Sequence, residues 1–207
     1  MKEKSSGGSN DPSSSRALFQ RVTSGARWND LAVPAPQRDA LRSIVQRVKA
    51  RVPVAASGLP GSAAHRSIMA LLVSPDSAAN RTAASVLANE LGVSLYRIDL
   101  SAVVGKYIGE TEKNLSRVFA DAEAAGAILF FDEAGALFGK RTDVKDAHDR
   151  FANIEVNYLL QRLEHFNGLV ILASNSRDKV DPTIVRRVDC VVELPVPGKP
   201  PKSDGAV

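Results

Sequence analysis

The sequence of 207 residues contains a single cysteine, Cys190, and no long apolar run. One cysteine excludes an internal disulfide and a zinc site built from several cysteines. A membrane-spanning helix requires roughly 20 apolar residues in succession, and no run approaches that length. The N-terminus is polar and lacks the apolar segment of a secretory signal peptide. These absences predict a cytoplasmic protein in a reducing compartment, with no membrane partner.

Histidine and strong charge are also scarce. His65, His148 and His165 are scattered and lack the spacing of metal ligands or of a nucleophilic triad. The net charge of +4 permits binding to an acidic partner but does not argue for one. We therefore do not expect a nucleic-acid partner.

Composition divides the chain into three parts. Residues 1–25 are rich in serine, glycine and charge, which predicts a disordered N-terminal arm. Residues 198–207 form a polar tail, also predicted to be disordered. The intervening residues 26–197 are long enough for one domain with a sizeable core.

Apolar segments alternate with helical patterns along this domain. The first helix carries Leu41, Ile44, Val45 and Val48 on one face and is followed by a connector over residues 52–67. The expected strands cover residues 68–73, 94–100, 127–131, 169–173 and 188–194. The expected later helices end before Gly92, run from Thr111 to Gly126, cover 150–165 and begin at Asp181. This alternation predicts an α/β fold, a parallel sheet sandwiched between helices.

The apolar run 127–131 ends in two adjacent carboxylates, Asp132 and Glu133. Burial in the sheet would carry a large desolvation penalty, so we expect them at the strand's C-terminal end, where open α/β sheets bind ligands. In P-loop nucleotide hydrolases the Asp at this place holds magnesium and the next Glu orients the attacking water. The alternative is a buried strand followed by the acidic first turn of a helix.

The first strand–loop–helix unit is where a phosphate-binding loop would lie. Such a loop needs glycines whose backbone N–H groups surround phosphate, a Lys, and a Ser or Thr for magnesium. Residues 74–82 contain neither glycine nor lysine, and Asp76 would lie close to the anion. The candidate nucleotide-binding residues are Pro75, Ser77, Ala79, Asn80, Arg81 and Thr82.

Two registers of this loop are possible. Helix spacing favours Asn80 at the Lys position and Arg81 at the Ser/Thr position. A shift by one residue places Arg81 and Thr82 there instead, but it demands an extra loop residue. The remaining alternative is an ordinary strand-to-helix turn that binds no ligand.

Several stretches, in order and spacing from about residue 28 to 197, resemble the AAA+ ATPase family, which has the P-loop NTPase fold. They are Asp99-Leu100-Ser101, Lys106 through Asn114, Phe131-Asp132-Glu133, Ala173-Ser174-Asn175, and Asp181-Pro182 through Arg187. Residues 138–142 and 148–155 resemble a bacterial subgroup that includes the AAA+ ATPases encoded with contractile injection particles. The resemblance implies ATP and Mg²⁺ as cofactors. It also implies a homo- or hetero-oligomeric ring whose ATP hydrolysis remodels protein assemblies.

The resemblance also implies roles for single residues. Asp132 would hold magnesium, Glu133 would polarise the hydrolytic water, and Asn175 would position that water. Arg187, with Arg186 beside it, would be the arginine finger that reaches a neighbouring subunit. Alternatively, these arginines form a solvated or salt-bridged helix end.

Lys106, Tyr107, Ile108 and Gly109 resemble the pore loop with which such rings grip a polypeptide substrate. An aromatic and an aliphatic residue on a glycine-flanked loop suit packing against an extended chain of any sequence. The alternative is that Tyr107 and Ile108 cover the core.

The sequence departs from the family in several places. The phosphate loop, the Walker A motif, is degenerate. The chain stops near the last core strand, so we expect no helical lid with its second sensor Arg. Asp189 stands where related sequences often carry a basic residue, and Gly135 replaces a second Asp.

These departures predict an AAA+ core domain with weakened nucleotide binding and hydrolysis. The alternative is a non-hydrolysing pseudo-ATPase, a structural or regulatory subunit of an active AAA+ ring, because a subunit can donate an arginine finger without hydrolysing ATP.

Overall fold

The computed structural model describes residues 18–23, 25–56, 67–98, 110–138 and 157–195. Six strands form one sheet in the order β1-β3-β4-β5-β2-β6. They are β1 (Phe19–Val22), β2 (Ile68–Val73), β3 (Leu95–Ile98), β4 (Ile128–Phe131), β5 (Leu169–Ser174) and β6 (Cys190–Glu193). All neighbouring strands are parallel except β1, which pairs antiparallel with β3. The predicted α/β class and parallel sheet are confirmed.

Helices precede or follow these strands. They are α2 (Ala35–Ala56), α3 (Ser77–Leu91), α5 (Glu110–Ala125), α6 (Ala134–Leu137) and α8 (Pro182–Val185), with short 3-10 turns η1 (Trp28–Asp30) and η2 (Arg177–Lys179). Residues 157–165 are also helical. Helix α3 ends where predicted, because Gly92 takes a left-handed backbone with φ 69° that glycine adopts without steric penalty. None of the helices in the described part of the chain has the length and apolarity of a membrane span.

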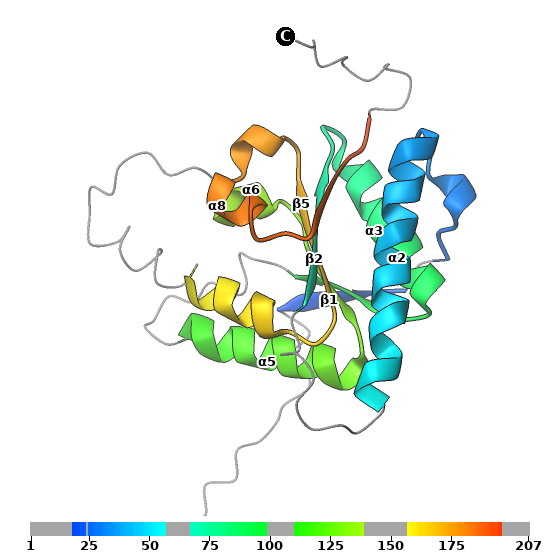
Figure 1. The fold of residues 1–207 in the computed structure, drawn as a ribbon. Coiled ribbons are helices and arrows are strands. Elements are labelled where there is room, and N and C mark those ends of the chain that lie inside the picture. The colour runs from blue at the N-terminus through cyan, green and yellow to red at the C-terminus, as the bar shows by residue number, and fades with distance from the viewer. Residues whose placement is uncertain (1–17, 24, 57–66, 99–109, 139–156, 196–207) are drawn as a thin grey trace, which may run out of the picture.

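The sheet separates two apolar layers, and successive strand residues point into opposite ones. Leu129 and Phe131 of β4 pack in a layer with α5 and the helix at 157–165. Ile128 and Phe130 pack in the other layer, with α2 and α3. Figure 1 shows α2 and α3 on one side of the sheet, with α5, α6 and α8 on the other. The sheet is therefore buried on both faces, as the apolar strands predict.

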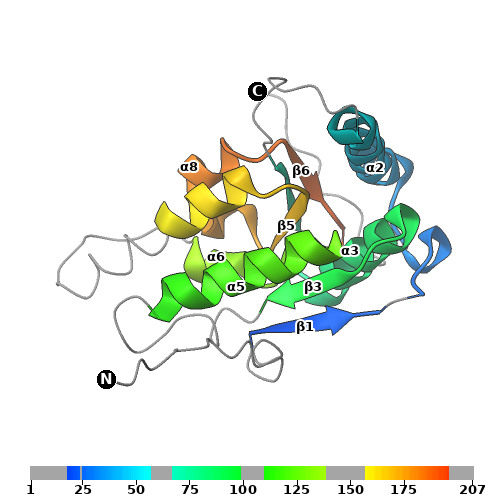
Figure 2. The same cartoon turned by 90° about the horizontal axis from the view of Figure 1, so that it is seen from below.

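The structure differs from the sequence prediction at the N-terminal arm. Disorder is expected over residues 1–25, yet Phe19–Val22 form β1 at the edge of the sheet (Figure 2). Phe19 stacks on Tyr96 with ring centroids 4.4 Å apart, and Gln20 accepts a hydrogen bond from Arg97 at 2.8 Å. Four residues carry too short a pattern to be recognised as a strand without the partner that pairs with them. Helix α2 also runs through Ala56, past the start of the predicted connector.

The topology brings the C-terminal ends of three strands to one edge of the sheet. Strand β2 lies next to β5, with Val73 opposite Ser174, and β4 lies on the other side of β5, with Phe131 opposite Leu172. The chain segments that leave these ends are the β2–α3 turn, Asp132-Glu133 and Asn175. This edge holds most of the predicted site.

Candidate functional site

The turn from β2 to α3 is short and closed by its own hydrogen bonds. Ser74, fully buried, donates its backbone N–H to the Ser174 carbonyl at 3.0 Å. Its hydroxyl accepts the backbone N–H of Asp76 at 3.2 Å. Pro75 lies exposed between them and has no N–H to offer. The turn therefore presents few donors toward the edge of the sheet.

Helix α3 begins at Ser77, early in the segment that would form a phosphate loop. Asp76 is the N-cap residue, and its carboxylate accepts the backbone N–H of Ala78 at 2.9 Å. The N–H of Ala79 bonds to the Asp76 carbonyl at 3.1 Å. Free N–H groups at a helix N-terminus are what bind phosphate. Here two of them are satisfied within the chain, and a carboxylate occupies the end of the helix.

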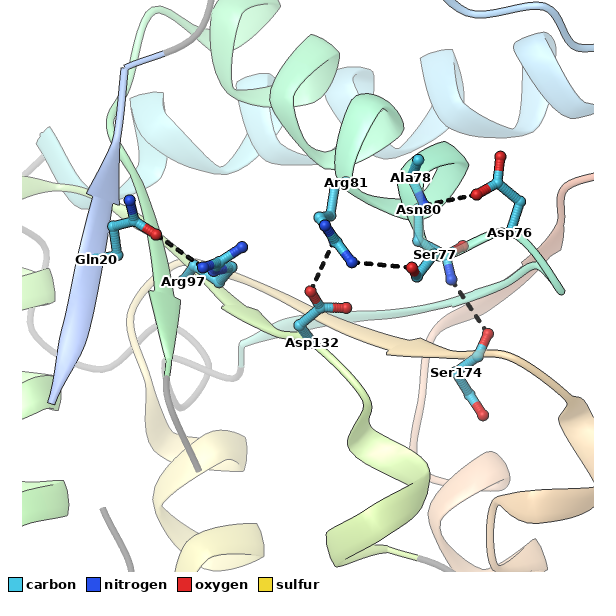
Figure 3. Close-up of polar contacts among 9 residues, drawn as sticks. All are labelled: Gln20, Asp76, Ser77, Ala78, Asn80, Arg81, Arg97, Asp132 and Ser174. Atoms are coloured by element: carbon cyan, nitrogen blue, oxygen red, sulfur yellow. Dashed lines mark hydrogen bonds and ion pairs between the residues drawn. The ribbon is translucent and has the colours of Figure 1, made fainter. Parts of the chain in front are cut away.

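Asn80, at the predicted Lys position, is buried and points into the sheet edge. Its side-chain Nδ2 donates to the Ser174 carbonyl at 3.1 Å, while its Oδ1 is buried and has no hydrogen-bond partner among the described residues. The amide thus ties α3 to the end of β5 (Figure 3). It brings no positive charge to the site.

Arg81 and Asp132, which the sequence separates by 51 positions, form an ion pair across the site. Arg81 Nε lies 3.0 Å from Asp132 Oδ2, and Arg81 Nη2 donates to the hydroxyl of Ser77 at 2.9 Å. Figure 3 shows the arginine reaching from α3 to the carboxylate that follows β4. The side chains are 46% and 18% exposed, so the ion pair contributes about 1 kcal/mol or less to stability. The residue that pairs with Asp132 is Arg81, a contact that neither of the two registers predicted.

Glu133 is exposed beside Asp132 and has an unusual backbone. Its φ of 58° and ψ of 38° lie in the left-handed region, and it is the N-cap residue of the short helix α6. No other non-glycine residue in the described part of the chain has a positive φ. Its side chain is exposed to solvent at the edge of the sheet.

The end of β5 is built around Ser174. Its carbonyl accepts hydrogen bonds from the backbone N–H of Ser74 and the side-chain amide of Asn80. Its hydroxyl donates to the Ser176 carbonyl at 2.8 Å. A β-carbon at Gly135 would lie 3.2 Å from that hydroxyl, so glycine allows α6 to approach β5 closely. Asn175 follows Ser174 and is exposed at the same edge as Asp132 and Glu133. The three predicted polar residues therefore follow the ends of two neighbouring parallel strands, β4 and β5, at one edge of the sheet.

The predicted arginine finger pairs with a residue outside this cluster. Arg187 follows α8 and pairs with Glu164 at 2.7 Å, on the helix at 157–165. Arg186 is exposed and makes no ion pair with a described residue. Asp189, which departs from the family, accepts the backbone N–H of Met69 at 2.8 Å and so fastens β6 to β2. Its role in this chain is structural.

The described residues do not form a metal cluster. In this part of the chain, no group of three or more His, Cys, Asp and Glu side chains could hold an ion. Mg²⁺ prefers octahedral oxygen ligands, and Asp132, the predicted metal ligand, already has a cation beside it. The pore-loop residues Lys106, Tyr107, Ile108 and Gly109 lie outside the described residues, as do His65 and His148.

Three contributors to the site were not predicted from the sequence in these roles: the Ser174 carbonyl, Glu164 and the cap formed by Asp76. The cap could have been predicted, because an Asp directly before a helical pattern indicates a helix N-terminus. The Ser174 carbonyl could not have been predicted, because every residue has a backbone acceptor and the side-chain pattern does not show which one is used.

A parallel sheet with a strand–turn–helix unit beside an acidic strand end is the arrangement of a P-loop AAA+ domain. The model of the ATPase family associated with various cellular activities (AAA) matches residues 71–196. This chain belongs to that family. The family implies ATP binding.

Relatives and solved structures agree with this assignment. The chain is 34% identical over 134 residues to the proteasome-activating nucleotidase of Aeropyrum pernix, covering 61% of this chain and 33% of that protein. It is 29% identical over 183 residues to an uncharacterized AAA family ATPase of Sinorhizobium fredii, covering 87% of this chain and 53% of that one.

Among solved structures, the FIGL-1 AAA domain superposes with a TM-score of 0.63 at 21% identity, covering 87% of this chain and 58% of that one. A chain of the E. coli MS115-1 HORMA:CdnC:Trip13 complex superposes with a TM-score of 0.64 at 19% sequence identity. The match covers 87% of this chain and 70% of that one. These two likenesses concern the fold alone. The chain spans about a third to a half of the length of the first two relatives named.

Proposed function

We propose that this AAA domain retains a weakened form of its family's activity, ATP binding and hydrolysis coupled to remodelling of protein assemblies. The observation that carries the proposal is the engagement of the phosphate-loop segment within the chain. The N–H groups of Ala78 and Ala79 bond to Asp76, and Asn80 bonds to the Ser174 carbonyl. A nucleotide has to displace these contacts, and it meets the Asp76 carboxylate instead of a lysine.

The absence of glycine from the phosphate-loop segment also lowers the expected affinity for ATP. A phosphate-binding loop turns its N–H groups inward through backbone conformations that glycine adopts and other residues resist. Ala78 and Ala79 are helical here, so the loop takes the conformation that its residues prefer. The degenerate Walker A motif therefore lowers affinity through backbone shape as well as through charge.

The polar residues that serve hydrolysis support the family activity. Asp132, Glu133 and Asn175 lie at one edge of the sheet; Glu133 as base and Asn175 as sensor are part of the proposal, and Asp132 stands at the family's metal position. Glu133 is exposed in a strained conformation, as residues of working sites often are.

We place the domain in a homo- or hetero-oligomeric AAA+ ring in the cytoplasm, acting on a polypeptide. Relatives named proteasome-activating nucleotidase and 26S proteasome regulatory subunit 10B support action on proteins. Arg186, exposed after α8, is available to a neighbouring subunit, and Arg187 becomes available if it leaves Glu164. The bacterial subgroup encoded with contractile injection particles remains our proposed placement.

A second candidate is the pseudo-ATPase that structures or regulates an active ring. The contrast between the phosphate-binding segment and the arginines after α8 favours this candidate. The phosphate-binding segment is closed, whereas the arginines that would act on a neighbour are retained. This candidate requires assembly with an active partner and no ATP turnover by the chain alone.

Calorimetry of ATP binding separates these possibilities. The variants are Asn80→Lys with Arg81→Thr, and the same pair with Asp76→Gly. We expect weak binding by the wild type and at least about tenfold tighter binding by the repaired loops, because a charge-assisted hydrogen bond contributes about 1.5–3 kcal/mol. Asp76→Ser is the matched control, since it removes the carboxylate and keeps an N-cap hydroxyl.

Micromolar ATP binding and turnover by the wild type, abolished in Glu133→Gln, would overturn the weakened activity. Repaired variants that bind, beside a wild type that does not, would favour the pseudo-ATPase. If no variant binds, the domain has lost nucleotide chemistry altogether.

A further inference from the structure

Asp132 is the residue that the family uses to hold magnesium, and here it already has a cation. Arg81 Nε lies 3.0 Å from Asp132 Oδ2, which is hydrogen-bonding distance for a charged pair. Asp132 is only 18% exposed, so its carboxylate has limited room for a second partner.

The guanidinium is held from two sides. Its Nε faces Asp132, and its Nη2 donates to the hydroxyl of Ser77 at 2.9 Å, one helical turn earlier on α3. A residue four positions away on a helix lies on the same face, so the contact with Ser77 fixes the direction of the side chain. Because the Arg81 guanidinium is part of the chain and already oriented, it pairs with Asp132 without the entropic cost of binding an ion from solution.

The position of Arg81 on α3 corresponds to a metal-binding position of the Walker A loop. In a P-loop hydrolase, the Ser or Thr hydroxyl of the Walker A loop and the acidic residue at the end of the Walker B strand face the same metal ion. Arg81 stands at that Ser/Thr position and faces that acidic residue. One oxygen ligand of the metal has therefore been replaced by a positive charge, while the carboxylate has been kept.

We infer that Arg81 is the resident counter-ion of Asp132 and excludes Mg²⁺ from it. The inference rests on the proposed function only in treating Asp132 as the family's metal position. Asp132 then serves to anchor the N-terminal turn of α3 to the end of β4. Any nucleotide phosphate that enters this site meets a guanidinium, and its binding is insensitive to removal of Mg²⁺.

Paramagnetic NMR tests the inference with the metal alone, so its result does not depend on nucleotide binding. Mn²⁺ substitutes for Mg²⁺ and broadens amide signals near its site, which reveals binding with a dissociation constant on the order of a millimolar. The full chain is titrated with Mn²⁺ as wild type, Arg81→Thr, and Arg81→Thr with Asp132→Asn. Arg81→Thr restores a hydroxyl ligand and removes the charge.

We expect selective broadening at Asp132, Glu133 and Ser77 in Arg81→Thr, none beyond the surface background in the wild type, and none in the double variant. The affinity gain over the wild type is at least about tenfold, because one positive charge beside a divalent ion is removed. Arg81→Lys keeps the charge and should still exclude Mn²⁺.

Arg42→Thr is the matched control, because it frees Asp39 from a surface pair at 3.8 Å without touching the site. Asp132-dependent broadening in the wild type would overturn the inference. So would a failure of Arg81→Thr to bind more tightly than the wild type, or broadening at Asp39 in the control equal to that at Asp132.

Discussion

Glu133 combines a charged side chain with a backbone conformation that favours glycine. A left-handed backbone places the β-carbon too close to the carbonyl oxygen and costs about 1–2 kcal/mol. Its φ of 58° is well inside that region. Strain of this kind persists where the surrounding structure enforces it and concentrates at functional positions. The proposed role of the carboxylate as base would explain why glycine does not stand here.

Glu133→Gly should therefore stabilise the domain. Relief of strain is partly offset by the greater freedom of glycine in the unfolded chain, so we expect a gain of about 0.5–1 kcal/mol. Urea unfolding at neutral pH measures it. The matched control is Glu133→Ala, which removes the carboxylate and keeps the β-carbon, and it should give no gain. An equal gain in both variants would assign the effect to repulsion between the Glu133 and Asp132 carboxylates.

Residue-scale contacts mark the limit of prediction from the sequence. Asp132 and Glu133 were placed correctly, because an apolar run that ends in acids has few possible locations in a sheet. The contact between Arg81 and Asp132 was not, because it depends on which side of α3 faces β4. Two registers one residue apart fit the sequence, and a helix turns by about 100° between them.

At the scale of elements, β1 is the least expected part of the fold. It covers the edge of β3, which would otherwise expose unpaired backbone groups. Its hold depends on Phe19, half-buried against Tyr96 at a centroid distance of 4.4 Å. Gln20 and Arg21 are exposed.

Phe19→Ala should lower the free energy of unfolding by about 1–2 kcal/mol, less than for a fully buried ring because Phe19 is only partly covered. Gln20→Ala is the control, and its loss of one exposed hydrogen bond should change stability by no more than about 0.5 kcal/mol. Urea unfolding measures both. Equal, near-zero effects would mean that β1 does not contribute to the cooperative unit.

The turn η1 is joined to α2 and α3 by the carboxylate of Glu90. Trp28 Nε1 donates to it at 3.1 Å, and Lys49 Nζ lies 3.5 Å away. The hydrogen bond from Trp28, followed by the charge of Lys49, lowers the pKa of Glu90 below its ordinary 4.5. A lowered pKa in the folded state means that the ionised carboxylate stabilises the fold above about pH 4.5, and that this stability is lost as pH falls through the folded pKa.

Wild type should therefore melt at a higher temperature than Glu90→Gln at pH 7, and the difference should disappear as pH falls below 4.5. The effect is small, because the group is solvent-exposed and its charges are screened. Thermal melts of both proteins across this pH range measure it, with Glu112→Gln on the exposed face of α5 as the control. A difference that does not change with pH would assign the effect to packing against Trp28.

At the scale of the whole molecule, the site is assembled by sheet topology. The β2–α3 turn, the acids after β4 and Asn175 after β5 come from segments about 50 residues apart and lie at one edge because their strands are parallel. The sequence predicted this edge well, since strand–helix alternation leaves few topologies. It did not predict the antiparallel β1 or the closure of the α3 N-terminus, because both depend on contacts between distant segments.

Strand β4, which ends at this edge, is buried on both faces. Phe130 is 1% exposed and Phe131 is fully buried, and they pack in opposite layers of the core. Phe130→Ala and Phe131→Ala should each lower the free energy of unfolding by about 3–5 kcal/mol, a large share of the 5–15 kcal/mol typical of a domain.

Chemical unfolding of each variant measures the loss. Phe130→Leu and Phe131→Leu keep most of the volume and give measurable proteins if the alanine variants do not fold. A sheet covered on one face only would make one substitution costly and the other nearly neutral. Comparable losses at adjacent positions are expected because helices cover both sides of the strand that ends at Asp132.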